Sequence, residues 1–328
     1  MQLSVVVPTL NGRTQLVACL DALAAVAPES EVVVVNGPSA DGTTGMVSER
    51  DDVDVLVEVA DRNLNVARNA GIEHTTGEHV AFVGYDKTIE SGWKDALMAG
   101  FDTGSHGDGR AHTIAEGYPP RMRRDVGVVT GPARSADGPT TPESRTITGR
   151  EVTYFDGSNV AFTRTALEEV DGFDEYLQTG GARDLAHRLA AAEYDVRWAA
   201  GMAVGDALGT ETTPSAPRAI SDGGRTERDW YWKYRALAYR LVKNYGLRPT
   251  TARRLLSHAG RDALTGLEGV VRGEASPTNW VGNGRDVLVG SLRGNGSGLA
   301  ARWRSRDRRN PNGLSARSER AVAVHDWR

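Results

Sequence analysis

The chain has 328 residues, a formal net charge of -4, and contents of 39% hydrophobic and 25% charged residues. These values are typical of a globular protein with a sizeable core, so they exclude a wholly disordered chain, and the length allows one large domain with or without an appendage. A single cysteine, Cys19, excludes a disulfide framework within the chain and fits a reducing compartment.

The basic residues are concentrated towards one end of the sequence. From residue 250 onward there are 14 Arg and no Lys against 7 Asp and Glu, whereas the remainder of the chain is acidic. A basic region of this kind indicates contact with something anionic, such as lipid headgroups, phosphates or the acidic body itself. A solvated tail is the alternative for the arginines around Trp303, and the acidic body argues against nucleic acid as a partner.

The opening segment MQLSVVVPTL has no basic region ahead of its apolar run, and no window approaches the roughly 20 apolar residues of a membrane-spanning helix. We therefore expect a cytoplasmic protein. If the arginine-rich region binds anionic lipid, the protein would associate peripherally with the inner face of the cell membrane.

Strands and helices are expected to alternate over the first hundred residues. The apolar runs at 3–7, 31–35, 53–59 and 79–83 read as strands, and each is followed by a loop and a helical pattern. Strands that are apolar on both faces and separated by single helices predict a mostly parallel sheet with right-handed crossovers. The fold class is therefore α/β, with a Rossmann-like half of the nucleotide-binding type.

The pattern changes after residue 100. Further strands are expected at 126–130, 152–163 and 196–198, helices near 165 and over 182–193, and two more helical patterns at 226–245 and 251–271. Beyond Gly294 the Gly-, Ser- and Arg-rich sequence is expected to fray. We divide the chain into an α/β domain at 1–225, with halves at about 1–100 and 101–225, a helical extension at 226–293 and a flexible tail at 294–328.

One carboxylate follows the fourth predicted strand directly. The run His79–Val83 leads into Gly84-Tyr85-Asp86, and the carboxyl ends of parallel strands face the ligand crevice of such folds. Asp86 is therefore a candidate functional residue. The alternative is that it only opens the turn before the next helix.

Several segments, in order along the chain, together resemble family 2 glycosyltransferases, the inverting enzymes with the GT-A fold. The resemblance covers about residues 1–245. It is carried by VVVPTLN at 5–11, EVVVVNGPSADGT at 31–43, NVARNAG at 65–71, FVGYD at 82–86, GSNVAF at 157–162, GFDE at 172–175 and the region 180–189.

The resemblance implies a nucleotide-sugar donor and a set of residue roles. Nucleoside-pocket residues would be Pro8, Asn11, Asn36 and Asp41, and Arg68 would lie near the diphosphate. Asp86 would bind Mg²⁺ or Mn²⁺ at the family's DxD position, and Asp184 would be the general base that deprotonates the acceptor hydroxyl. From the residues alone, Asp41 also reads as a helix cap and Asp184 as a surface residue in the first turn of a helix.

Three positions depart from the family pattern. Gly84 replaces the first DxD carboxylate, Asn36 replaces an aspartate, and Arg183 stands where a glutamate is expected before the base. A single carboxylate together with phosphate oxygens still holds Mg²⁺ in many sites, so we expect weak metal binding.

The sequence therefore predicts a hexosyltransferase-type enzyme of this family. It would move a sugar from a nucleotide to a glycan or lipid-linked acceptor, with inversion, in surface polysaccharide or glycoprotein glycan biosynthesis. The first alternative is a degenerate GT-A protein that binds a nucleotide sugar or a partner transferase without turnover. The second is a nucleotidyltransferase, which the lack of a glycine-rich activating loop disfavours.

Overall fold

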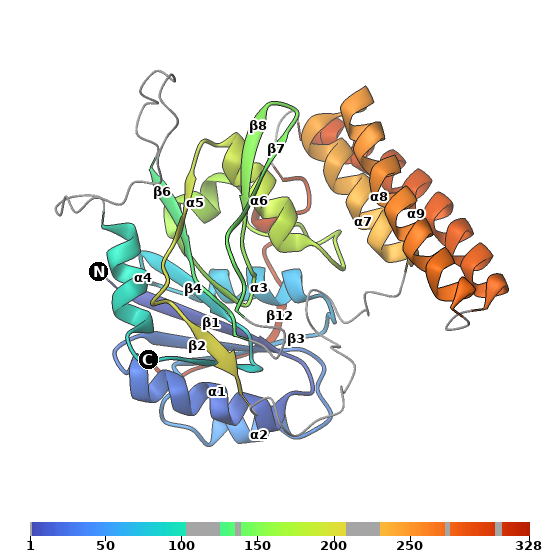
Figure 1. Ribbon diagram of the computed structural model, residues 1–328. Coiled ribbons are helices and arrows are strands. Elements are labelled where there is room, and N and C mark those ends of the chain that lie inside the picture. The colour runs from blue at the N-terminus through green and yellow to red at the C-terminus, as the bar shows by residue number, and fades with distance from the viewer. Residues whose placement is uncertain (1, 103–124, 135–138, 208–229, 273–275, 306–309) are drawn as a thin grey trace.

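The structure is a computed structural model that describes residues 2–102, 125–134, 139–207, 230–272, 276–305 and 310–328. Its centre is an eight-stranded sheet with the order β10-β6-β9-β4-β1-β2-β3-β12 (Figure 1). The strands are β1 (Leu3–Thr9), β2 (Glu31–Asn36), β3 (Val55–Val59), β4 (His79–Val83), β6 (Val126–Thr130), β9 (Asn159–Thr163), β10 (Asp195–Trp198) and β12 (Ala321–Asp326).

The first half forms the predicted parallel sheet. Strand β1 pairs in parallel with both β2 and β4, and β2 pairs in parallel with β3. Each strand is almost wholly buried, which the uninterrupted valine runs of β1 and β2 indicate. Strand β9 runs antiparallel to its neighbours β4 and β6, so the complete sheet is mixed.

Helices cover both faces of this sheet, and two separate apolar cores result. One core contains α1 (Arg13–Val26), α2 (Thr43–Ser48) and α4 (Trp93–Phe101). The other contains α3 (Leu64–Glu73), α5 (Arg164–Glu169) and α6 (Gly181–Ala191). Alternate residues of one strand serve opposite cores, as Val5 and Val6 of β1 do, because successive strand side chains point to opposite faces.

Two small antiparallel pairs stand beside the main sheet. Strand β5 (Lys87–Ile89) pairs with β11 (Val204–Asp206), and β7 (Glu143–Ile147) pairs with β8 (Arg150–Tyr154). The first pair brings residue 206 next to the end of β4, a contact between distant parts of the sequence. The second is a hairpin whose turn is Thr148-Gly149.

Three long helices lie along one side of the molecule (Figure 1). They are α7 (Trp230–Tyr245), α8 (Pro249–Val271) and α9 (Pro277–Arg304). Helix α9 packs closely on α7 through buried glycines: a Cβ at Gly294 would lie 2.3 Å from the carbonyl oxygen of Arg235, and one at Gly290 would lie 2.4 Å from that of Tyr231. The predicted boundary at 225 lies outside the described residues.

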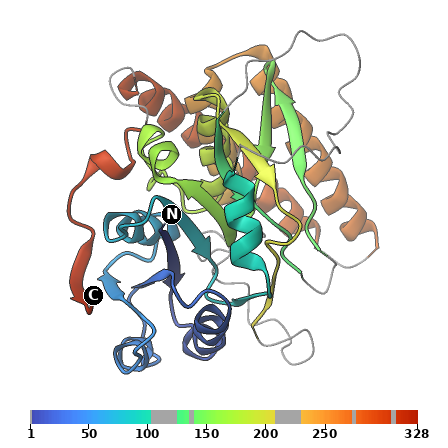
Figure 2. The same ribbon diagram turned by 90° about the vertical axis from the view of Figure 1, so that its left-hand side faces the viewer.

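The region after Gly294 differs from the expected frayed tail. Helix α9 continues to Arg304, a short 3-10 helix η1 covers Leu314–Ala316, and β12 then pairs antiparallel with β3. Figure 2 shows this last strand at the edge of the sheet. The end of α9 was not predicted because Gly294, Gly296 and Gly298 read as a linker. In the structure, Gly294 and Gly298 allow close contact with α7. None of the described helices is long and apolar enough to cross a membrane.

Candidate active site

The first two loops at the carboxyl edge of the sheet are joined by hydrogen bonds. The backbone N–H of Asn11 donates to Oγ of Ser39 at 2.8 Å, and Oδ1 of Asn11 accepts from the backbone N–H of Ala40 at 2.8 Å. Ser39 in turn donates to Oδ1 of Asn36 at 2.7 Å. The structure therefore brings the predicted pocket residues Asn11 and Asn36 into one network.

Asp41 ties together the beginnings of two helices. Its Oδ2 accepts from the backbone N–H of Arg13 at 3.0 Å, at the start of α1, and its Oδ1 accepts from the backbone N–H of Thr43 at 3.2 Å, at the start of α2. Partial burial acts to raise the pKa of Asp41, but these bonds outweigh it and hold the pKa below its usual value. Asp41 is not the N-cap of α2, which is Gly42, but from the preceding position it accepts the N–H of the first helical residue.

Tyr85 connects these loops with the loop after β4. Its ring packs over the backbone of Gly12, where a Cβ would lie only 2.1 Å from Cε2 of the ring. Burial, with the negative charges of Asp86 and Asp41, raises the pKa of Tyr85 to about 12. The middle residue of the Gly84-Tyr85-Asp86 segment thus lies within the electrostatic reach of both candidate carboxylates.

Asp86 is half-exposed and lies in a cluster of charges. Nζ of Lys87 is 3.8 Å from its Oδ2, and Lys87 also donates to Asp206, its partner across the β5–β11 pair. Burial raises the pKa of Asp86, Lys87 opposes the shift, and the charges of Asp206 and Asp156 reinforce it. Asp86 and Asp206 therefore share one ammonium at this edge, and the charge of Asp156 acts on Asp86 as well.

This cluster fits a divalent cation in its charge and donor type. Asp86, Asp206 and Asp156 supply carboxylate oxygens, which Mg²⁺ and Mn²⁺ prefer, and a cation would relieve their mutual repulsion. Across the described part of the chain, however, no group of three or more His, Cys, Asp or Glu side chains is arranged to hold a metal ion. Asp86 would thus need further ligands from the donor phosphates or water.

Two of the predicted site residues, Arg68 and Pro8, are buried. Arg68, on α3, is only 4% exposed; its guanidinium donates to the carbonyl oxygen of Gly157 at 2.9 Å and lies 5.0 Å from the ring centroid of Phe173. Arg68 therefore fastens the loop between β8 and β9. Pro8 is buried and borders a small cavity of about 20 Å³ between the loops after β1 and β3.

Asp184 lies in the first turn of α6 and has no exposed surface. Its Oδ2 accepts from Nε of Arg188 at 2.8 Å and from Nζ of Lys243 at 3.0 Å, and its Oδ1 accepts from Asn244 at 2.9 Å. Burial acts to raise the pKa of Asp184, but the charges of Lys243 and Arg188 outweigh it, so the pKa lies well below its usual value. A general base needs access to the acceptor and a higher pKa, and this geometry provides neither.

Sequence reasoning missed the charged partners of both aspartates. Lys87 follows Asp86 directly, which was a readable signal. Asp206 lies 119 residues after Lys87 in the sequence and contacts it only because β5 pairs with β11. No local sequence pattern predicts this contact. Lys243 lies four residues after Tyr239 on the buried face of α7, where both contact Asp174. A lysine on the apolar face of a predicted helix indicates only weakly that it pairs with a buried carboxylate.

Comparison with known sequences identifies a protein family and related glycosyltransferases. The sequence model described as "Glycosyl transferase family 2" matches residues 4–171, about half of the chain. Pre-mycofactocin glycosyltransferase of Mycobacterium tuberculosis strain H37Rv is 27% identical over 199 residues, which are 60% of this chain and 40% of that protein. Glycosyltransferase AglE of Haloferax volcanii is 32% identical over 97 residues, 27% of this chain and 32% of that one. The chain thus spans less than half the length of these relatives.

Solved structures share the fold at low sequence identity. The S. aureus TarS 1-349 structure in complex with UDP-GlcNAc has a TM-score of 0.57 and 15% identity, with coverage of 94% of this chain and 93% of that one. The mannosyltransferase PcManGT of Pyrobaculum calidifontis, in complex with GDP-Man and Mn²⁺, has a TM-score of 0.52 and 18% identity, with coverage of 89% and 86%. These likenesses confirm the predicted GT-A fold. On the family match, the chain belongs to glycosyltransferase family 2.

Proposed function

We propose that the protein transfers a sugar from a nucleotide-sugar donor to a glycan or lipid-linked acceptor with inversion, in surface polysaccharide or glycoprotein glycan assembly. The observation that carries this proposal is the meeting of three loops at one sheet edge: those with Asn11, with Asn36 and Asp41, and with Asp86. Ligands of open α/β sheets bind at such an edge. Sugars activated by GDP and UDP in the two solved neighbours support this class of donor.

Each of the predicted donor-side residues would contact a different part of the nucleotide sugar or hold a loop around it. Asn11, Asn36 and Asp41 hold the loops that would surround the nucleoside, beside Pro8. Arg68 fixes the loop at Gly157, which would border the diphosphate. Asp86 would hold Mg²⁺ or Mn²⁺, which supplies positive charge to the leaving diphosphate. The Mn²⁺ in the PcManGT complex supports that assignment.

The transfer step needs a proton acceptor. The acceptor hydroxyl attacks the anomeric carbon, its proton passes to a base, and the bond from that carbon to the diphosphate oxygen breaks, so that a nucleoside diphosphate leaves. Asp184 as this base remains a prediction from the family resemblance. Its burial with Lys243 and Arg188 favours the second candidate function, in which the protein binds a nucleotide sugar or a partner transferase without turnover.

Contact with an anionic lipid surface would suit a lipid-linked acceptor. Helix α9 exposes a row of apolar side chains at spacings of seven and four residues, which place them on one helical face. They are Val281, Leu288, Leu292, Leu299 and Trp303, between 42% and 72% exposed. Exposed arginines of the same helix, Arg285, Arg293 and Arg304, would add attraction to anionic headgroups.

A panel of UDP- and GDP-linked sugars, each with and without Mn²⁺ or Mg²⁺, tests this function by thermal shift and by nucleotide release. We expect one donor to raise the melting temperature, and Asp86→Asn to weaken the metal-dependent part of that rise. Asp51→Asn, at an exposed loop position, is the matched control. No response to any donor would refute nucleotide-sugar binding. A response without nucleotide release, in the presence of candidate acceptors, would select the second candidate function.

A further inference from the structure

A polar cavity lies between the β7–β8 hairpin and the helical extension, outside the sheet edge that carries Asn11, Asn36 and Asp86. Its volume is about 430 Å³, and it is bordered by the hairpin turn, the end of α6, the end of α7 and residues Arg248 and Arg302. Strand β8 runs from Arg150 at this cavity towards Asp156 at the crevice. At about 3.3 Å per residue of extended chain, these two residues are separated by at most about 20 Å.

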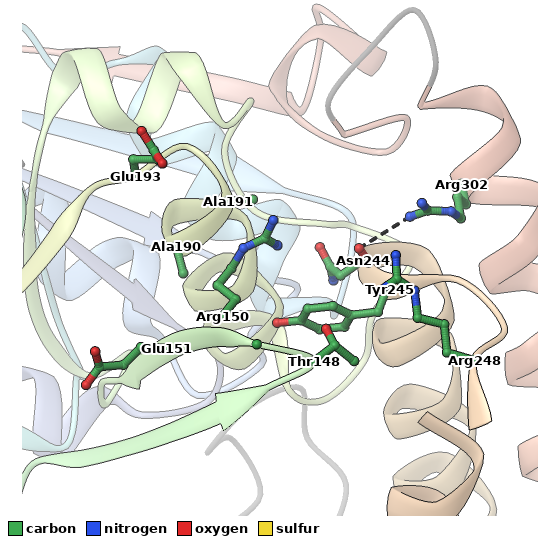
Figure 3. A pocket seen from close by; sticks show the side chains of 11 residues that line it. Thr148, Arg150, Glu151, Ala190, Ala191, Glu193, Asn244, Tyr245, Arg248 and Arg302 are labelled. Carbon is green, nitrogen blue, oxygen red and sulfur yellow. Dashed lines mark hydrogen bonds between the residues drawn. The ribbon is translucent and has the colours of Figure 1, made fainter. Parts of the chain in front are cut away.

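Three arginines border this cavity. They are Arg150 from β8, Arg248 from the loop before α8 and Arg302 from α9. In Figure 3 their guanidinium groups approach Asn244 and Tyr245 from different sides, whereas Glu151 and Glu193 lie at the opposite rim. No carboxylate within the described ranges forms an ion pair with any of the three.

Uncharged groups hold two of these arginines in place. Nη1 of Arg302 donates to the carbonyl oxygens of Lys243 at 3.1 Å and Asn244 at 3.3 Å, and the guanidinium carbon of Arg150 lies 5.8 Å from the ring centroid of Tyr245. These contacts orient the side chains but leave their charges uncompensated. Guanidinium groups bind phosphate oxygens in pairs, so three of them lining one cavity are a donor set suited to a phosphate group.

Further arginines lie near the wall of the cavity formed by Tyr245. His187, on α6, donates or accepts a hydrogen bond with the hydroxyl of Tyr245 at 2.8 Å, directly beneath the cavity wall. Burial lowers the pKa of His187 to about 3, and the charges of Arg240, Arg254 and Arg183 add to that effect while Asp184 opposes it. An anion entering the cavity would therefore meet a positive potential from more than the three lining arginines.

We propose that this cavity binds a phosphate or diphosphate group through Arg150, Arg248 and Arg302. Binding of the anion stands apart from the donor crevice and does not need the proposed transferase function. The further assignment, that the group belongs to the acceptor, does rest on that function. An acceptor anchored here by its phosphate would extend along β8 for at most about 20 Å to reach the sheet edge near Asp86.

Titration of the full chain with inorganic diphosphate, followed by isothermal calorimetry at low and at physiological salt, tests the anion site. We expect saturable binding that weakens about tenfold in Arg150→Gln and in Arg302→Gln, as expected for loss of one charged hydrogen-bonding group. Arg253→Gln is the matched control, because Arg253 lies exposed on α8, the helix that follows Arg248, but outside the cavity. It should bind like the natural protein.

Binding that is absent at millimolar diphosphate, or that falls equally in Arg253→Gln, overturns the proposal. So does binding that is unchanged in both Arg150→Gln and Arg302→Gln, because the anion would then bind outside this cavity. Since Arg302 also supports the backbone of α7, Arg302→Lys provides a second variant; it keeps the charge and should retain most of the binding if the folded structure is intact.

Two further titrations distinguish the source of the phosphate. Vesicles of phosphatidylcholine containing phosphatidic acid present it as a lipid headgroup, and glucose 1-phosphate presents it on a soluble sugar. If inorganic diphosphate displaces the vesicles and Arg150→Gln weakens vesicle binding, the site binds a phosphate carried by a lipid. If only the sugar phosphate binds tightly, the site binds a soluble phosphate. Failure of every nucleotide sugar to bind, with diphosphate binding intact, would refute the transferase function and leave this site standing.

Discussion

Nζ of Lys243 lies 3.0 Å from Oδ2 of Asp184, and both side chains are almost wholly buried between α6 and α7. The same ammonium contacts Asp174, which follows Gly172-Phe173, so one cation compensates two buried carboxylates. We expect Lys243→Met to lower the free energy of unfolding by about 3–5 kcal/mol, because both carboxylates would lose this compensation. Urea unfolding measures the loss. Lys233→Met on the same helix, where the pair with Asp262 is partly exposed, should cost less than about 1 kcal/mol.

Asp184→Asn separates a structural function from a catalytic one. The substitution keeps the shape of the side chain but removes the charge that faces Lys243 and Arg188. We expect a stability loss of about 2 kcal/mol or more, with donor binding retained. A variant with natural stability and donor affinity, but with turnover reduced by about a hundredfold or more, would instead identify Asp184 as the base.

The glycines of α9 allow a prediction with opposite signs at neighbouring positions. In Gly294→Ala the new methyl would lie 2.3 Å from the carbonyl oxygen of Arg235, so we expect a loss of about 1–3 kcal/mol. At Gly296 nothing lies within 4 Å, and Gly296→Ala should stabilise the helix by about 0.5–1 kcal/mol. Thermal unfolding of both variants measures the difference. Equal effects would show that α9 does not pack on α7 as described.

His187 should make the protein sensitive to mild acid. The folded protein keeps this histidine neutral down to about pH 3, whereas the unfolded chain binds a proton below about 6.5, the ordinary pKa. The free energy of unfolding should therefore fall by about 1.4 kcal/mol per pH unit for this one proton as the pH drops from about 6.5 towards 3. Urea unfolding at pH 7 and pH 5 should show a smaller difference for His187→Gln. Tyr245→Phe, which removes the partner hydroxyl but keeps the histidine, should retain the full difference.

The apolar face of α9 predicts binding to anionic vesicles. Replacing Leu288 and Leu292, which are 67% and 72% exposed, by Gln should weaken vesicle binding about tenfold or more without loss of thermal stability. Co-sedimentation with vesicles of phosphatidylglycerol measures the effect. Val322→Gln, at an exposed position of β12, should bind like the natural protein. If all variants bind alike, this face is not the lipid contact.

The sequence predicted most of the sheet but only part of the site. Strands such as Val32–Val35 are buried on both faces and therefore carry a long apolar signal, which is why the parallel half was placed correctly. Asn11, Asn36 and Asp41 come together because they lie in loops that follow adjacent strands. The partners of Asp86 and Asp184 depend on tertiary contacts instead. Asp206 and Lys243 reach them through a strand pair and a helix contact, and local sequence periodicity contains no information on either.

The edge position of β12 bears on the order in which the sheet is assembled. Residues 1–100 are synthesised before β12, and β1–β4 contain the contacts needed to begin folding. The outer side of β3, however, has its partner only when residues 321–326 have been made, and Arg328 then forms an ion pair with Glu31, 297 residues earlier. Until that point β3 presents unpaired backbone groups, a template for association between nascent chains. The yield of folded protein should thus depend on how quickly synthesis reaches residues 321–326.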